Sequence, residues 1–156
     1  MEEARQIILF TVENDPYAVP VEALISIEKW SEPRKIPKVP TYIRGTAHIR
    51  GELMPVVDAR QLFCDEPMEM TSNVRLLVLE GADHPIALLV EEAKELITVK
   101  TTDIKDPHVN QFGAASYWQG MIQIEEELVM LVDVEKLFDS LHNWDEVKSF
   151  LQGEAV

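Results

Sequence analysis

Short apolar segments separated by turn residues recur along most of the chain. Residues 7–12 and 17–21 are two such segments, and Asn14, Asp15 and Pro16 between them are typical of a hairpin turn. Because no long helical segments separate them, the pattern favours an all-β barrel or sandwich over a parallel sheet. The other predicted strands cover residues 53–57, 75–79, 86–90, 96–99 and 128–132.

Helical signals follow two of these strands and recur at the C-terminal end. Asp58 can cap a short helical turn, and Asp133 can cap an equivalent turn over residues 134–138. The last segment predicts a helix over about residues 139–152. Its apolar stripe would cover a lobe of the protein or, alternatively, lie in the groove of a partner; the stripe consists of Leu137, Leu141, Trp144, Val147 and Leu151.

The chain contains an internal repeat. A shift of 75 residues aligns residues 42–63 with 117–138 without a gap, and a shift of 69 residues aligns residues 7–19 with 76–88. Chance matching of common apolar residues is the alternative, but glycine, aspartate and a Leu-Phe pair also match in register. We interpret the repeat as two similar β lobes, one over about residues 15–85 and the other formed by the remainder, within a single domain of residues 1–156.

Charge and composition narrow the classes of partner. Of the 156 residues, 28 are acidic and 14 are basic, which gives a net charge of −14. Nucleic acids and anionic membrane surfaces attract clustered lysine and arginine, so neither is expected as a partner. The N-terminal residues lack the features of a secretory signal, and no apolar run approaches the roughly 18 residues that span a bilayer. A cytoplasmic protein is therefore expected.

No group of residues points to catalysis, a metal or a cofactor. Asp58 and Asp133 could form the acid pair of a hydrolase, but capping explains both, and catalytic carboxylates must lie within roughly 5–10 Å of each other. Cys64 has no second cysteine with which to form a disulfide or a metal knuckle. The four histidines are widely spaced and lie at positions His48, His84, His108 and His142. An enzyme is not expected.

Two arginines, Arg44 and Arg50, stand out in this acidic chain because each directly precedes a glycine. The arginine side chain presents a planar fork of donors that suits pairing with carboxylates at an interface. Gly45 and Gly51 allow backbone conformations or close approaches that other residues disfavour. The alternative is that both arginines are merely exposed at the ends of hairpins.

Several short motifs around these arginines follow one pattern. They are Pro-x-x-Pro at 37–40, an aromatic-Ile-x-Gly step at 42–45, Ile-Arg-Gly at 49–51 and Pro-Val-Val-Asp-Ala-Arg at 55–60. With these motifs the chain resembles the CheW family of chemotaxis coupling proteins, over about residues 5–140. The resemblance implies two five-stranded SH3-like β-barrel subdomains around a shared hydrophobic core, with short helices and a C-terminal helix.

The resemblance also implies a function and a set of partner-binding residues. Members of the family are adaptors without catalytic activity or cofactor, which connect the cytoplasmic tip of methyl-accepting chemoreceptors to the regulatory domain of a chemotaxis-type histidine kinase. By position, Arg50 corresponds to the interface arginine of the family, and Arg44 to a basic position beside it. Leu24 and Ile27 correspond to apolar positions near both contacts. The expected partner-binding set is Leu24, Ser26, Ile27, Arg44, His48, Ile49 and Arg50.

Two departures from the family pattern bear on the choice of partner. Ser26 stands where the family often has a glutamate beside the interface arginine, and His48 replaces the usual asparagine. Glu28 can face the same way as Ser26 on a strand and so take over as the ion partner. The departures indicate a diverged coupling protein, for example of a second chemosensory system. A receptor-only binder, or a β-barrel that holds a small apolar metabolite in the cleft between its lobes, is the alternative function.

Overall fold

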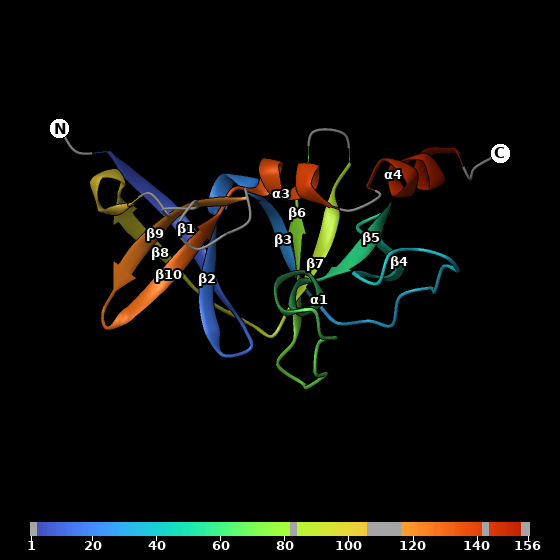
Figure 1. The fold of residues 1–156 in the computed structure, drawn as a ribbon, viewed down its shortest axis with the longest axis horizontal. Coiled ribbons are helices and arrows are strands. Elements are labelled where there is room, and N and C mark those ends of the chain that lie inside the picture. Colours follow the sequence, from blue (N-terminus) through green and yellow to red (C-terminus); the bar gives the residue numbers. More distant parts are fainter. Residues whose placement is uncertain (1–2, 82–83, 106–116, 142–143, 154–156) are drawn as a thin grey trace.

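Two five-stranded sheets lie side by side in the computed structural model (Figure 1). The structure describes residues 3–81, 84–105, 117–141 and 144–153. Sheet A contains, in spatial order, β8 (Glu92–Lys100), β1 (Ala4–Val12), β2 (Asp15–Pro20), β10 (Glu127–Val132) and β9 (Trp118–Ile124). Sheet B contains β3 (Leu24–Lys29), β6 (Arg75–Leu79), β7 (Ile86–Val90), β5 (Glu52–Asp58) and β4 (Ile43–Ile49). The predicted all-β class is confirmed.

The sheets are open, whereas the family resemblance implied closed barrels. Among the described strands, no ladder joins the edge strands β8 and β9 of sheet A, or β3 and β4 of sheet B. The segment before β4 adds only one isolated bridge to that edge, between Arg34 and Thr46. Pro33, Pro37 and Pro40 in this segment have no N–H group to donate, so a longer ladder cannot form there.

The helices are short. Those in the described part of the chain are α1 (Ala59–Cys64), α3 (Val134–Ser140) and α4 (Trp144–Gly153), with single 3₁₀ turns η1 (Val21–Ala23) and η2 (Thr101–Asp103). The helix expected over about residues 139–152 is interrupted, because Leu141 has an extended backbone that ends α3 before α4 begins. The side chains of Leu141, Trp144 and Val147 are buried in the core, as its predicted stripe requires. The side chain of Leu151, and residues His108 and His142, lie outside the described part.

The two sequence repeats exchange their hairpins. Strands β4 and β5 with helix α1 correspond to β9 and β10 with α3, and hairpin β1–β2 corresponds to β6–β7. Each hairpin lies between strands of the other repeat. Its outer neighbour pairs antiparallel, β8 with β1 and β3 with β6, and the other pairing is parallel, Ala18 with Leu131 in sheet A and Val56 with Ala87 in sheet B. Sheet B therefore spans residues 24–90. The first lobe expected from the sequence, about residues 15–85, begins within hairpin β1–β2, which belongs to sheet A.

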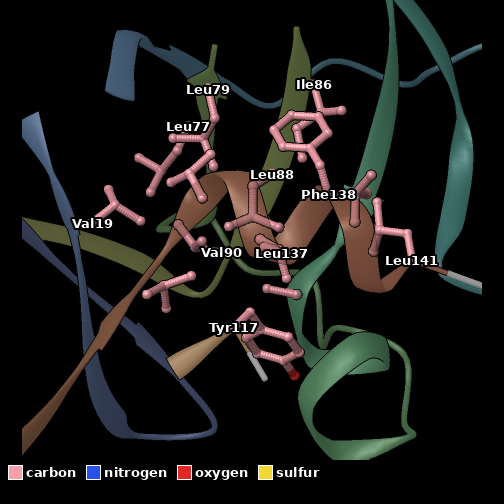
Figure 2. Packing of buried hydrophobic residues seen from close by; sticks show 14 of the residues in the cluster. Val19, Leu77, Leu79, Ile86, Leu88, Val90, Tyr117, Leu137, Phe138 and Leu141 are labelled. Carbon is pink, nitrogen blue, oxygen red and sulfur yellow. The ribbon is translucent and has the colours of Figure 1, made fainter. Parts of the chain in front are cut away.

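One apolar cluster fills the space between the sheets. Leu77 and Leu79 of β6 point into this shared core, where Figure 2 shows them with Leu137 and Phe138 of α3, while Leu76 and Val78 point to a separate cluster on the other face of sheet B. Strand β7 alternates in the same way. Both faces of these central strands are buried, which explains why their sequences are continuous apolar runs.

An aromatic cluster extends the shared core towards α1. The ring centroids of Tyr17 and Phe63 lie 4.9 Å apart, and those of Tyr117 and Trp118 lie 4.7 Å apart. Phe63 also stacks on Tyr117 at 5.8 Å. The cluster joins strand β2 and the start of β9 to a helix of the other lobe, so both lobes depend on it.

Burial of the tyrosines generates a prediction for alkaline pH. Desolvation raises the pKa of Tyr17, Tyr42 and Tyr117 from 10.0 to about 12, and the chain has 3 tyrosines. The fold favours the neutral phenols, so their contribution to stability is complete below pH 10 and is lost as the pH rises through about 12. An ultraviolet titration of phenolate absorbance should give a midpoint near 12 for the folded protein and near 10 in denaturant. Equal midpoints would contradict this burial.

The close approach of Gly45 to the backbone of Arg34 generates a second prediction. A Cβ atom there would lie 2.3 Å from the backbone oxygen of Arg34, and the φ angle is +147°. We expect Gly45→Ala to lower the free energy of unfolding by roughly 2–4 kcal/mol in urea denaturation. Gly51→Ala is the control: φ is +82° but no atom lies within 4 Å, so only backbone strain of about 1 kcal/mol is expected. Equal losses in the two variants would count against the steric explanation.

Candidate functional site

Strand β3 presents an apolar surface at the edge of sheet B. Among the described strands it pairs only with β6. Its side chains alternate, so that Leu24, Ser26 and Glu28 are half-buried whereas Ile25 and Ile27 are 47% and 41% exposed. Two neighbouring isoleucines exposed to this degree on an edge strand form a surface to which another protein can bind. Ile25 was not among the residues expected from the sequence, although the alternation from residue 24 to 29 could have revealed it.

Arg50 lies beside this strand, at the tip of the β4–β5 hairpin. Its φ angle of 54° and that of Gly51, 82°, form the tight turn between the two strands. The Arg50 Nε donates to Glu28 Oε2 at 3.2 Å, and the arginine side chain remains 66% exposed. The expectation that Glu28 replaces the missing glutamate as ion partner is confirmed. The pair also joins the two open edges of sheet B.

Arg44 is held inside the lobe instead. Its Nε donates to Asp58 Oδ2 at 3.0 Å, and its Nη2 donates to the Met68 carbonyl oxygen at 3.1 Å. The same Asp58 oxygen accepts the Met68 N–H at 2.9 Å. Arg44 thereby ties the segment after α1 to sheet B, and these contacts give it a structural role. A direct contact between Arg44 and a partner stays a prediction.

The remaining expected residues differ in their exposure. His48 on β4 is exposed, whereas Ile49 is buried in the separate cluster of sheet B. Leu24 packs against the shared core. The Ser26 hydroxyl is buried and has no hydrogen-bond partner among the described residues. Of the seven residues, therefore, Ile27, His48 and Arg50 are the exposed ones that a partner can contact directly.

Asp58 and Asp133 both act as helix caps. Asp58 Oδ1 accepts the Gln61 N–H, and Asp133 Oδ1 accepts the Lys136 N–H, each at 3.1 Å. One caps α1 and the other α3, at equivalent places of the two repeats. Both carboxylates therefore act as caps, as the sequence indicates.

Cys64 lies in a cluster that sequence reasoning missed. Burial, together with the nearby Glu13 carboxylate, raises the pKa of the Cys64 thiol to about 11. Arg60 bridges Glu13 and Glu66 at 3.5 and 3.1 Å beside it. The thiol is therefore protonated at neutral pH and is no nucleophile. The Glu13 partner comes from the β1–β2 turn, so sequence spacing could not reveal it.

The described residues contain no group of histidine, cysteine, aspartate or glutamate side chains that could hold a metal ion. Within the same residues, no helix is long and apolar enough to cross a membrane. A groove of about 530 Å³ between sheet A and the loop before β6 is lined by Glu91, Glu92, Glu95 and Glu127, among others. Its carboxylates do not suit the apolar metabolite that the ligand-binding alternative requires.

Comparison with known proteins identifies the family. The CheW-like domain matches residues 6–142, which is most of the chain. The chain belongs to the CheW-like domain family. The Arg50 turn and the capping Asp58 lie within the matched residues, so the CheW-like domain includes the candidate surface.

Relatives of this CheW-like domain match along nearly their whole length. The chemotaxis protein CheW of Bacillus subtilis is 29% identical over 140 residues, which cover 89% of this chain and 90% of the relative. The protein of the same name from Rhizobium meliloti is 26% identical over 137 residues, or 87% and 88% of the two chains. The crystal structure of the scaffolding protein TtCheW from Thermoanaerobacter tengcongensis has a TM-score of 0.78 at 19% identity, covering 87% and 88%. That structure supports the fold.

The two caps of the CheW-like domain generate a matched prediction. Asp133→Ala removes one cap bond and should cost about 1 kcal/mol of unfolding free energy. Asp58 is 1% exposed and also binds Arg44 and the Met68 N–H, so Asp58→Ala should cost roughly 2–4 kcal/mol. This expected loss is smaller than the loss from breaking a fully buried ion pair, because the Arg44 side chain is 28% exposed. Denaturant unfolding measures both; equal losses would show that Arg44 and Met68 add nothing.

Proposed function

We propose that this CheW-like domain is a non-enzymatic adaptor that couples chemoreceptors to a chemotaxis-type histidine kinase. It acts in the cytoplasm and is recruited to receptor arrays through protein contacts. Its partners are the regulatory domain of the kinase and the cytoplasmic tip of the receptors, and it uses no cofactor, nucleic acid or direct membrane insertion. Family membership over residues 6–142 supports this function.

The observation that carries the proposal is the surface formed by β3 and the β4–β5 turn. It combines two exposed isoleucines, Ile25 and Ile27, with the ion pair of Arg50 and Glu28. An apolar centre beside an arginine is the composition of interface hot spots. Arg50 corresponds to the interface arginine that the sequence motif implies, and its ion pair with Glu28 holds it beside the strand that carries both isoleucines.

Arg50 is free to serve a partner because the fold gains little from it. An ion pair as exposed as this one contributes roughly 0–1 kcal/mol to stability. The guanidinium bonds Glu28 through Nε, and an arginine fork has further N–H groups that can donate to a carboxylate of the partner. Binding would also remove water from the pair and so strengthen it. The serine at position 26 and the histidine at position 48 then modify which partner fits.

The test is binding to the regulatory domains of the chemosensory histidine kinases encoded in the same genome, measured by calorimetry. One of them should bind with micromolar affinity or better. Arg50→Glu should weaken that binding by roughly 1–4 kcal/mol because it places a like charge beside Glu28 and removes the donor. Ile27→Ser should also weaken it, with stability nearly unchanged, because the side chain is 41% exposed.

Lys136→Glu is the matched control for charge. It changes the net charge by the same amount on an exposed side chain of α3, far from β3 in the sequence and on the other repeat. Its affinity should equal that of the unaltered chain. If Arg50→Glu bound the kinase as well as this control did, the role of Arg50 would be refuted. If no kinase bound at all, the adaptor function itself would be refuted.

A further inference from the structure

A basic segment interrupts this acidic chain between β3 and β4. Residues 29–38 contain four of the 14 basic residues, Lys29, Arg34, Lys35 and Lys38, but only one acidic residue. Arg44, Arg50 and Arg60 all pair with carboxylates. By contrast, Arg34 and Lys35 form no ion pair with any residue that the structure describes, and both are exposed. They create a local positive potential on a chain whose net charge is −14.

The backbone of this segment is fixed. The N–H and carbonyl groups of Arg34 each form a 2.8 Å hydrogen bond with Thr46 of β4, and Pro33 beside it is buried. Gly45 allows this close approach, as shown above. The cationic side chains therefore project from an ordered backbone, so a ligand that binds them does not have to order the loop first.

The segment and the β4–β5 hairpin enclose a groove of about 530 Å³. Arg34 and Lys35 line it from the loop, and His48 lines it from β4. Between them lie three apolar residues, Ile36, Pro37 and Leu53. The groove thus offers positive charge and apolar surface together. Because Pro37 has no N–H group, recognition must depend on side chains rather than on the addition of a strand.

We propose that this groove binds a short acidic segment of a partner protein. Carboxylates of the segment pair with Arg34 and Lys35, and an apolar side chain between them packs on Ile36, Pro37 and Leu53. A nucleic acid would bring a continuous row of phosphates past the exposed carboxylates of Glu32 and Glu52 and would be repelled. A peptide with a few acidic residues avoids this repulsion. This binding goes beyond the proposed function, because it does not require Arg50. It also specifies the kind of segment that is bound, which is acidic with an apolar side chain.

The test uses a capped peptide with a Glu-Asp pair on each side of a Val-Leu pair, titrated into the full chain and followed by NMR. The amide signals of Ile36, Thr46, His48 and Leu53 should move together. Raising the salt concentration should weaken binding, since exposed charges are screened. Arg34→Glu with Lys35→Glu should weaken it by about tenfold or more. These variants leave the backbone bonds to Thr46 in place.

Lys105→Glu with Lys136→Glu is the matched control. Lys105 forms the equivalent bridge with Met121 in the other lobe, both lysines are exposed, and the change in net charge is the same. This variant should bind the peptide with nearly unchanged affinity. Arg50→Glu should retain peptide binding even if it loses the kinase, which separates this inference from the proposed function. The inference is overturned if the groove signals stay in place, if a peptide with lysine for each acid binds equally well, or if single-stranded DNA binds there more tightly.

Discussion

The structure depends on the burial of two hairpins, each in the sheet of the opposite repeat. Hairpin β6–β7 lies at the centre of sheet B, where every side chain from Ile86 to Val90 is buried. Strand β7 of this hairpin pairs in parallel with β5. This pairing fixes the position of β5, and with it the positions of Asp58 at the end of β5 and of the β4–β5 turn before it. The candidate surface at Arg50 is therefore positioned by strands of the repeat to which it does not belong.

The same framework carries different chemistry in the two lobes. Arg50 and Glu125 lie 75 residues apart, adopt nearly the same φ angles of 54° and 55°, and have opposite charges. Asp58 binds an arginine and the Met68 N–H as well as its cap, whereas the Asp133 carboxylate bonds no described residue beyond the one N–H group that it caps. The repeat preserves backbone geometry where packing requires it, and the side chains that reach solvent have diverged. Each lobe consequently offers a distinct surface to its surroundings.

The sequence predicts those parts of the fold that buried apolar runs determine. The central strands were found because both of their faces are apolar, and the caps were found because a local motif specifies them. The edge strands β4 and β9 were missed since Gly45 and Gly120 and several polar residues interrupt their pattern. The bond of Arg44 to Asp58 also escaped prediction, because it depends on how the segment around Met68 folds back. Glu28 could be predicted as the partner of Arg50 because strands alternate with a period of two.

The exchange of hairpins also constrains how the chain folds during translation. Hairpin β1–β2 is complete at Pro20, but its two neighbours in sheet A, β8 and β10, end only at Lys100 and Val132, so the sheet around it is complete only at Val132. At ordinary rates of protein synthesis, this delay is roughly 6 to 20 seconds. Until β8 follows, Ile7, Phe10 and Val19 have no neighbouring strand from the second repeat, and until β10 follows, the sheet that contains them is incomplete. The nascent chain therefore presents an unpaired apolar hairpin, of the kind that chaperones bind, until the second repeat leaves the ribosome.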